Sequence, residues 1–327
     1  MYNFSRIIVI AAAVAFALGI LLFPTLIAVC QKRKLFDTPG GRKVHQNNTP
    51  RLGGLVFLPS ALVGCCVSLL ATEVEFSSFW LCYSLPMTGM LGVFALGVLD
   101  DLFDISAKMK FLVQILCAAF VPLAGFTINV VWVMDMTSMS GVLVNSIITV
   151  FVIVFVTNAI NLIDGIDGLA TCLSIVAFVG FTWLFDLYMV VLAFTSSMTG
   201  VLIAFLRHNL LERSDKNRLF MGDSGSLTLG YSLAFLLIYV LSQGDCNEVE
   251  AYKNILLVGS LIAVPILDEC RVIWVRLRRK QPLFQADKRH IHHLLMNKGL
   301  NQHQALMVII VLQLVIILAA YGIVQYI

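Results

Sequence analysis

The stretch Ile7–Val29, with the sequence IIVIAAAVAFALGILLFPTLIAV, decides the fold class. It contains no charged residue, and a helix needs about 20 apolar residues to cross a bilayer. A signal-peptide core is shorter, at about 7–15 apolar residues, and Arg6 is the only charged residue before this run. We therefore expect a first membrane helix that is retained.

The remainder of the 327-residue chain has the same character. Hydrophobic residues make up 59% of it, charged residues only 13%, and the mean hydropathy is +0.92. Soluble domains carry about 25% charged residues, so this composition excludes a soluble protein. We expect an all-α polytopic membrane protein whose residues 1–327 form a single integral membrane domain.

Apolar runs of about 20 residues mark the expected membrane helices. They predict about ten helices, and the weak break at Asp186 allows one more or one fewer. The runs cover residues 6–29, 52–71, 80–99, 108–126, 142–161, 169–186, 188–206, 224–242, 253–274 and 304–325. Segment 127–141 contains a short β-like run, which predicts a loop, with a small hairpin as the alternative.

Lys and Arg are distributed unevenly over the expected loops. Of these 22 residues, 19 lie in four segments on one side of the predicted helices: 30–51, 100–110, 207–223 and 275–303. Positively charged loops of membrane proteins tend to stay in the cytoplasm. The distribution predicts that these segments and residues 158–168 face the cytoplasm, and that both chain termini lie outside.

Two adjacent carboxylates, Asp100 and Asp101, close the third expected helix. Neighbouring carboxylates repel each other unless a cation neutralises them, and acidic side chains at a helix C-terminus oppose the helix dipole. Mg²⁺ is typically held by one or two carboxylates together with substrate phosphates. The pair therefore favours a cation-binding site over the alternative, an ordinary solvated helix end.

A second polar cluster lies at the end of the fifth expected helix. Asn158, Asn161 and Asp164 share one helical face because they recur every three residues, and Asp167 adjoins that face. Asn side chains both donate and accept hydrogen bonds, which suits a nucleobase or a sugar. The alternative is a polar helix–helix seam, but four such residues are many for a seam. We predict that they bind substrate.

The eighth expected helix begins within the sequence Phe220-Met-Gly-Asp223-Ser-Gly. A carboxylate at the start of a helix, such as that of Asp223, serves either as a cap or as a metal ligand. Phe220 either stacks on a base or anchors the chain at the membrane interface. The residues alone leave both alternatives open.

Histidines gather in the most basic expected loop, at His290, His292 and His293. The adjacent pair and the lack of a nearby cysteine disfavour a tetrahedral zinc site. Histidines among arginines better suit a diphosphate.

Further basic residues lie in the other expected cytoplasmic segments. Lys110 can reach back towards the Asp100–Asp101 pair, and His45 and Arg51 can serve a phosphate or an anionic lipid head group. All of the polar motifs therefore fall on one predicted face of the membrane, which favours a single composite site.

These motifs together resemble the polyprenyl-phosphate N-acetylhexosamine-1-phosphate transferase family, which includes the MraY, WecA and TagO types. The resemblance extends from about Asp37 to Leu295. Four strings carry it, in the order that the family shows: Val98-Leu-Asp-Asp101, Asn161-Leu-Ile-Asp-Gly-Ile-Asp-Gly-Leu169, Met221-Gly-Asp-Ser-Gly-Ser226 and His290-Ile-His-His-Leu294.

The resemblance implies transfer of a sugar 1-phosphate from a UDP-sugar to undecaprenyl phosphate, with release of UMP and a requirement for Mg²⁺ or Mn²⁺. It implies that Asp223 binds the metal ion, that Asp100 activates the lipid phosphate with Asp101 beside it, and that Lys110 faces the phosphates. It also implies the bacterial inner membrane as the location. Family members are often dimers, so a homodimer is an expectation, and nothing suggests a nucleic-acid partner.

The resemblance also assigns the substrate-binding residues. Asn161, Asp164 and Asp167 match nucleotide-site positions, Phe220 matches a uracil-stacking position, and the His290–His293 string matches the family's histidine motif. Ile291 interrupts the three consecutive histidines of MraY-type sequences, and Pro50-Arg-Leu-Gly-Gly54 is similar to the WecA and TagO types. These departures favour UDP-N-acetylglucosamine over UDP-N-acetylmuramoyl-pentapeptide, with other UDP-N-acetylhexosamines left open.

The expected reaction is a single displacement. A lipid phosphate has a second pKa near 6, so at pH 7 it is largely dianionic and able to attack the sugar-bearing phosphorus. A two-step route through an aspartyl-phosphate is the alternative. Two rival classes fit less well: a secondary transporter predicts internal repeats and polar residues at helix midpoints, and a lipid phosphatase leaves the Asn-rich motif unexplained.

Overall fold

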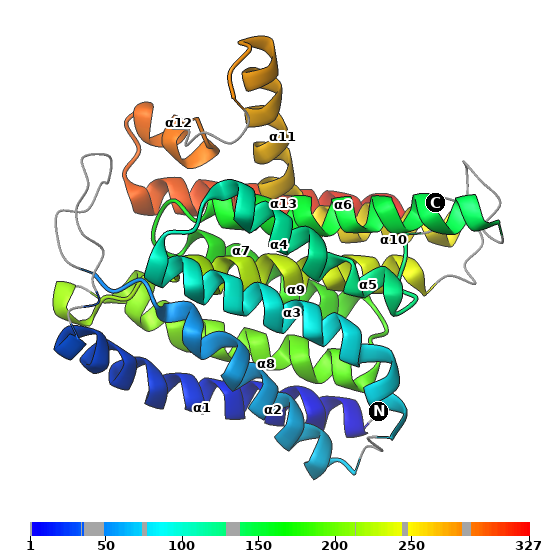
Figure 1. Cartoon of the computed structure of the whole chain (residues 1–327), viewed down its shortest axis with the longest axis horizontal. Coiled ribbons are helices and arrows are strands. Elements are labelled where there is room, and N and C mark those ends of the chain that lie inside the picture. Colours follow the sequence, from blue (N-terminus) through cyan, green and yellow to red (C-terminus); the bar gives the residue numbers. More distant parts are fainter. Residues whose placement is uncertain are drawn as a thin grey trace. The chain divides into compact units, whose positions relative to one another are not determined.

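The computed structural model describes residues 2–33, 35, 49–73, 77–128, 138–212, 214–243, 248–282 and 289–327. All regular elements among these residues are helices (Figure 1). The predicted phosphate-binding residue His45, and residues 129–137 of the expected loop or hairpin, lie outside the described ranges.

The helices coincide with all ten expected regions, although several regions are divided. Their bounds are α1 Tyr2–Arg33, α2 Phe57–Ala71, α3 Ser77–Phe103, α4 Ala107–Ala118, α5 Phe120–Leu123, α6 Met139–Ile163, α7 Leu169–Leu184, α8 Met189–Leu206, α9 Gly222–Ser242, α10 Glu248–Leu261, α11 Ala263–Arg278, α12 Ile291–Asn297 and α13 Gln302–Val324. Short helical turns, η1 Gly53–Val56 and η2 Arg207–Leu211, extend α2 and α8.

Seven helical segments among the described residues are long and apolar enough to cross a membrane. They are Phe4–Arg33, Gly53–Ala71, Tyr83–Phe103, Met139–Ile163, Met189–Leu211, Gly222–Ser242 and Gln302–Val324. The other three expected spans are shorter or interrupted: 108–126 breaks between α4 and α5, α7 has only 16 residues, and 253–274 breaks between α10 and α11.

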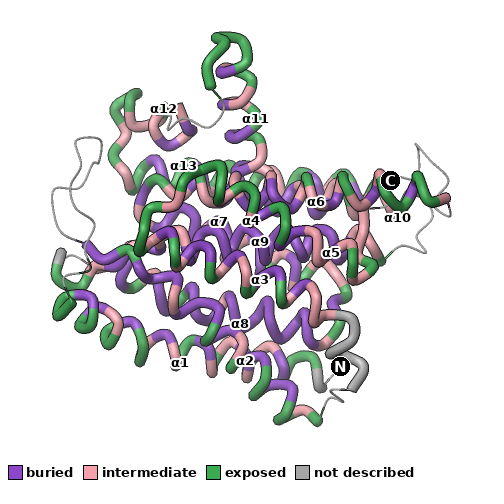
Figure 2. Tube along the Cα trace, in the orientation of Figure 1, coloured by how far each residue is buried: buried purple, intermediate pink, exposed green. Residues whose placement is uncertain are grey.

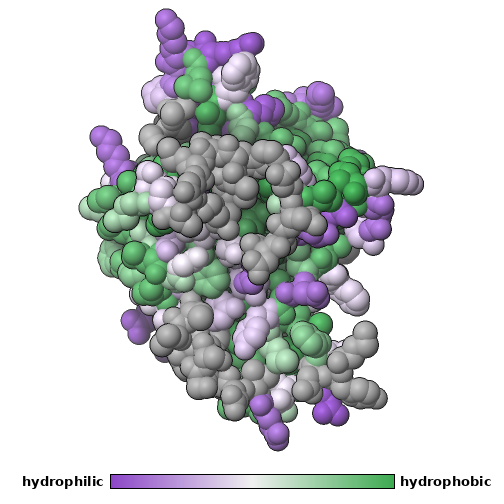
Figure 3. All heavy atoms as spheres, turned by 90° about the vertical axis from the view of Figure 1, so that its right-hand side faces the viewer, coloured by the Kyte–Doolittle hydropathy of each residue, from purple (hydrophilic) through white to green (hydrophobic). Residues whose placement is uncertain are grey.

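Large hydrophobic side chains cover much of the outer surface of these helices. Leu21, Leu70, Phe151 and Leu318 are each about two-thirds exposed, and hydrophobic atoms also reach the face shown in Figure 3. Water would make such surfaces costly, whereas lipid does not. The chain is therefore a membrane protein.

The chain folds as two compact units. Unit 1 comprises Met1–Leu81, Phe94–Ile105 and Phe178–Thr228, and unit 2 comprises Cys82–Val93, Ser106–Ala177 and Leu229–Ile327.

In unit 1, helices α1, α2 and α8 pack against one another. Fourteen of the 18 residues of α8 are buried, and Figure 2 colours most of this helix as buried, which agrees with its mainly apolar sequence. The rings of Phe57 and Phe205 meet edge to face with centroids 5.0 Å apart, and Phe23 packs on both. These contacts hold the start of α2 beside the end of α8.

In unit 2, the chain breaks at Ile262, between α10 and α11. Pro265 has no N–H to donate to the carbonyl of Leu261. The fully buried side chain of Gln313, on α13, fills the gap: its Nε2 donates to the carbonyls of Ser260 (2.6 Å) and Leu261 (3.1 Å), and its Oε1 accepts from the N–H of Val264 (3.1 Å). One amide therefore replaces the helical bonds that are lost at the break.

Beyond the break, α11 leaves the direction of α10 and α13 at a steep angle (Figure 1). The expected helix 253–274 is thus not one straight span. Its second half, α11, contains five charged residues among its apolar ones, and it places Asp268 and Arg271 next to the histidine string described below.

Candidate active site

In unit 1, the end of α3 meets the start of α9 through Asp101. Its Oδ1 accepts a hydrogen bond from the backbone N–H of Asp223 (2.7 Å), and its Oδ2 accepts one from that of Ser224 (3.0 Å). The first N–H groups of a helix have no partner within the helix, and a carboxylate there also interacts favourably with the helix dipole. Asp101 therefore caps α9 and fixes the backbone that carries Asp223.

Gly222 makes this close approach sterically feasible. Its φ is +73°, and a Cβ at this position would lie 1.9 Å from the carbonyl oxygen of Arg51 and 2.7 Å from both carboxylate oxygens of Asp101. Only glycine avoids both the backbone strain and the clash.

Backbone hydrogen bonds join the segment around Arg51 to the start of α9. The N–H of Phe220 donates to the carbonyl of Pro50 (2.8 Å), and the N–H groups of Gly53 and Gly54 donate to the carbonyls of Phe220 (3.0 Å) and Met221 (2.8 Å). Unit 1 therefore brings four predicted site residues into one region: Arg51, Asp101, Phe220 and Asp223.

Asp100 is buried at the end of α3 and stabilises the turn that follows. Its Oδ1 accepts from the N–H of Ile105 (2.7 Å), and its carbonyl accepts from that of Asp104, whose φ is +54°. Asp100 and Asp101 are adjacent in sequence, but the Asp100 carboxylate binds the turn after α3 whereas the Asp101 carboxylate binds the start of α9.

The chemistry of these groups suits a hard divalent cation. No cluster of three or more His, Cys, Asp or Glu that could hold a metal ion is present among the described residues, but Mg²⁺ typically takes only one or two carboxylates and completes its shell with water and phosphate oxygens. The Asp223 carboxylate is near enough to that of Asp101 for the two to repel each other, and a cation relieves such repulsion. The carboxylates of Asp223 and Asp101 are thus chemically compatible with the metal site that the resemblance implies, and that site stays a prediction.

In unit 2, Asn158 links two helices. Its Nδ2 donates to Oε1 of Gln114 on α4 (2.6 Å) and to the carbonyl of Val154 (2.8 Å), and Gln114 is buried. This is the kind of contact that the helix–helix seam predicts. The substrate-binding role of Asn158 stays a prediction.

The remaining residues of the Asn-rich motif lie at and beyond the end of α6. Asn161 is in its last turn, Asp164 caps its C-terminus, and Asp167 lies in the turn that leads to α7. All three are half-buried, as is Lys110 on α4. Because α6 ends at Ile163, the predicted common helical face holds for the two asparagines but not for Asp164, whose ψ of 61° is not helical.

The histidine string lies at the start of α12, also in unit 2. His290 is its N-cap residue, and His290 and His292 are both buried, with nearly parallel rings 6.0 Å apart. The His292 ring lies against the turn after α6, because a Cβ on Gly165 would be only 2.2 Å from its Nε2. The structure therefore brings the histidine string and the Asp164–Asp167 turn together, as the composite site predicts for these two motifs.

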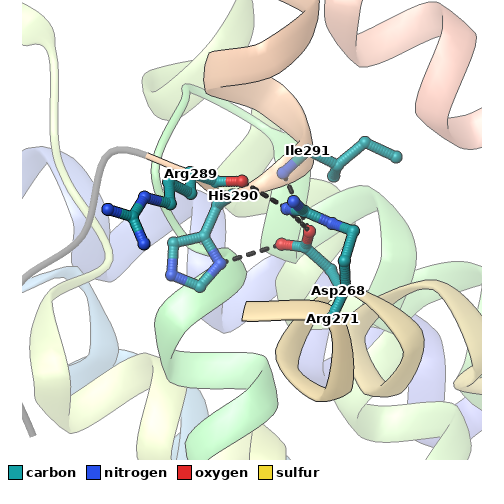
Figure 4. Close-up of polar contacts among 5 residues, drawn as sticks. All are labelled: Asp268, Arg271, Arg289, His290 and Ile291. Carbon is teal, nitrogen blue, oxygen red and sulfur yellow. Dashed lines mark hydrogen bonds and ion pairs between the residues drawn. The ribbon is translucent and has the colours of Figure 1, made fainter. Parts of the chain in front are cut away.

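Asp268 and Arg271, on α11, were not predicted from the sequence. The Asp268 carboxylate accepts from Nδ1 of His290 (2.8 Å), from the N–H of Ile291 (2.9 Å) and from Arg271 (2.7 Å), as Figure 4 shows. The available signal was the charged string Asp268-Glu-Cys-Arg271 inside an otherwise apolar run, since such charges mark functional positions in membrane proteins.

The electrostatic setting of this cluster follows from burial and charge. Burial raises the pKa of the Asp268 carboxyl, but its hydrogen bonds to His290 and Arg271 outweigh burial and lower the pKa below its usual range. For His292, burial and then the neighbouring histidines lower the pKa to about 3. At neutral pH Asp268 is therefore ionised and His292 is uncharged. Neither His292 ring nitrogen has a hydrogen-bond partner among the described residues.

Comparison with known proteins supports the resemblance. Residues 83–241 match the model of glycosyl transferase family 4. A Bacillus subtilis (strain 168) protein named "probable undecaprenyl-phosphate N-acetylglucosaminyl 1-phosphate transferase" is 32% identical over 317 residues, covering 92% of this chain and 81% of the relative.

Two further relatives are named undecaprenyl-phosphate alpha-N-acetylglucosaminyl 1-phosphate transferase. The Yersinia pestis protein is 31% identical, covering 90% of this chain and 78% of its own length, and the Escherichia coli (strain K12) protein is 29% identical, covering 89% and 78%. With this extent of similarity, and with the motifs ordered as they are, the chain belongs to glycosyl transferase family 4.

Proposed function

We propose that this protein transfers N-acetylglucosamine 1-phosphate from UDP-N-acetylglucosamine to undecaprenyl phosphate. The products are UMP and undecaprenyl-diphospho-N-acetylglucosamine, a first membrane-bound intermediate for cell-envelope polysaccharides such as lipopolysaccharide or teichoic acid. The observation that carries the proposal is the similarity over about nine-tenths of the chain to relatives with this activity in their names. The Asp101–Asp223 arrangement supports it, because it supplies the carboxylates that a diphosphate reaction needs.

Each part of the reaction has residues suited to it. Asp100 orients the lipid phosphate or removes its residual proton, and Phe220 stacks on the uracil ring. Lys110 and the histidine string hold the diphosphate oxygens, while Asn161, Asp164 and Asp167 bind the nucleotide. Asp223 holds Mg²⁺ or Mn²⁺, which when bound neutralises phosphate charge.

The lipid phosphate attacks the sugar-bearing phosphorus, a new P–O bond forms, and the bond to UMP breaks. We further propose that the chain resides in a bacterial inner membrane. The four basic segments and the reacting groups then face the cytoplasm, where UDP-sugars are made, and both termini lie outside. A homodimer is the assembly expected from the family.

The test is release of UMP by the purified protein in detergent with Mg²⁺ and a panel of UDP-sugars, with and without undecaprenyl phosphate. Lipid-dependent UMP from UDP-N-acetylglucosamine, lost in Asp223→Asn, is the expected result. Asp104→Asn is the matched control, because Asp104 is exposed and asparagine tolerates its positive φ. If UMP is released only from another UDP-sugar, that sugar replaces UDP-N-acetylglucosamine as the proposed donor. If no donor yields UMP, the proposal is refuted.

A further inference from the structure

One buried carboxylate, that of Asp268, organises the chain at residues 289–291. The Asp268 side chain is almost completely buried, and its two oxygens accept three hydrogen bonds: from the ring of His290, from the backbone N–H of Ile291 and from Arg271. Arg271 also donates to the backbone carbonyl of Arg289 (Figure 4). Asp268 is therefore bonded directly to two consecutive residues at the start of α12, and through Arg271 to a third.

These contacts determine which nitrogen of His290 carries a proton. An ionised carboxylate only accepts hydrogen bonds, so Nδ1 of His290 must be the donor. In the neutral ring the other nitrogen, Nε2, is then left as an acceptor.

The position of α12 also depends on Asp268. This helix has only seven residues, and helices of that length are not stable on their own in water. The N–H of Ile291 belongs to the first turn, where a helix offers no internal partner, and Asp268 supplies that partner.

The effect extends to the turn after α6 through His292. Its ring stacks nearly parallel to that of His290, with an interplanar angle of 5°, and it lies against Gly165. A shift of α12 would therefore move His292 away from the turn that carries Asp164 and Asp167.

We propose that Asp268 is a positioning residue for the transfer reaction: its carboxylate fixes the ring of His290 and the start of α12, and through His292 it fixes the Asp164–Asp167 turn. This inference rests on the proposed function, in which His290 and that turn bind the nucleotide sugar.

The kinetic test compares Asp268→Asn with Glu269→Gln in the full-length protein. Glu269 is the matched control, because it is a buried carboxylate next to Asp268 on the same helix whose charge also acts on His290, while its Oε2 has no hydrogen-bond partner among the described residues. The comparison therefore separates the hydrogen bonds of Asp268 from the effect of a nearby charge alone. We expect Asp268→Asn to lower kcat/KM for UDP-N-acetylglucosamine roughly 10- to 100-fold, the range found where a carboxylate that orients a metal-bound histidine is removed. KM for undecaprenyl phosphate should change less than twofold, and Glu269→Gln should stay close to wild type.

A double mutant separates positioning from other roles. If Asp268 acts through His290, then Asp268→Asn should cost less than threefold further in a His290→Ala background. Three results would overturn the inference. Asp268→Asn could lower kcat/KM as much in the His290→Ala background as in the wild type, Glu269→Gln could lower it as much as Asp268→Asn, or Asp268→Asn could leave it unchanged.

A second measurement is independent of activity. ¹⁵N NMR of histidine-labelled protein, with His290 assigned by its loss in His290→Ala, should show a protonated Nδ1 in the wild type and an unprotonated one in Asp268→Asn. An unprotonated Nδ1 in the wild type would refute the positioning geometry. Wild-type protein that shows the expected spectrum but releases no UMP would refute the proposed function instead.

Discussion

At the scale of single residues, the two carboxylates that end α3 have separate tasks. Asp100 accepts from the turn that follows its own helix, whereas Asp101 accepts two N–H groups of α9, 122 and 123 positions away in the chain. A change at Asp101 therefore acts on the fold as well as on the reaction.

Replacing Asp101 with alanine should destabilise the protein as well as inactivate it. Loss of a helix cap costs about 1–2 kcal/mol, and the backbone of Asp223 is no longer held. Asp223→Asn should instead reduce UMP release at least about 100-fold, as loss of a group that stabilises transition-state charge does, with little change in stability. Thermal unfolding and UMP release of both variants in detergent check this, and equal destabilisation by the two would contradict the assignment of the cap to Asp101.

His292 should make stability depend on pH. Its pKa is about 3 in the folded protein and about 6.5 in an unfolded chain, so between these values only the unfolded chain binds the proton. Stability therefore falls as the pH is lowered below about 6.5. The melting temperature of His292→Gln should fall less than that of wild type between pH 7.5 and pH 5.

The control for that measurement is His303→Gln, since His303 is exposed at the start of α13. It should keep the wild-type pH dependence. If His292→Gln keeps it too, the buried histidine is not the group responsible.

Much of the candidate site could be predicted at this scale, because carboxylates, amides and histidines are expensive near a bilayer and stand out in an apolar chain. Their partners could not be predicted. Asp268 bonds His290 across 22 positions, and Gln114 bonds Asn158 across 44. Such pairs depend on helix packing, and no local pattern reveals them.

At the scale of elements, the break between α10 and α11 is the feature that the hydrophobic pattern missed. Residues 253–274 form an apolar run of membrane length that is interrupted only by the charged string Asp268–Arg271, so one span was expected. Pro265 was a local signal for the break, but the group that satisfies it, Gln313, lies on the last helix.

Replacing Gln313 with leucine should destabilise unit 2. The substitution leaves the carbonyl of Ser260 and the N–H of Val264 buried without partners, and such groups cost roughly 1–3 kcal/mol each. We expect a clearly lower melting temperature, together with reduced UMP release because α11 carries Asp268. Gln325→Leu is the control, since Gln325 is exposed at the end of α13; a loss of stability no greater than that of this control would contradict the bridging role.

The contact between α12 and the turn after α6 can be tested at Gly165. Alanine there would place a Cβ 2.2 Å from Nε2 of the His292 ring, which is a steric clash, so Gly165→Ala should raise KM for the UDP-sugar and lower stability. Gly259→Ala, on α10, is the matched control because its added Cβ has no neighbour within 4 Å; it should be neutral or stabilising by up to about 1 kcal/mol. Similar effects of the two substitutions would refute the contact.

At the scale of the whole molecule, composition determined the class correctly: the chain is helical and has exposed hydrophobic side chains along several membrane-length helices. The uneven placement of Lys and Arg then predicts orientation. These are summed properties of many residues, so they do not depend on any single contact.

Orientation can be tested with reporter fusions to the intact chain. Alkaline phosphatase fused after Ile327 should be active, and green fluorescent protein fused at the same position should not fluoresce, because the C-terminus is expected outside the cytoplasm. Fusions inserted after Glu212, in an expected cytoplasmic segment, should give the opposite pattern. Fluorescence at the C-terminus would reverse the predicted topology.

The hydrogen bonds of Gln313 also bear on how the protein is made. Chains fold from the N-terminus as the ribosome releases them, and Gln313 emerges 52 residues after Leu261. Until it is inserted, the break after Leu261 lacks the amide that bridges it, and α11 lacks the contact that fixes its direction. The histidine string is therefore held in place only after α13 has been made, and a nascent chain that stalls within α13 would have its earlier membrane helices but an unsupported α11 and α12.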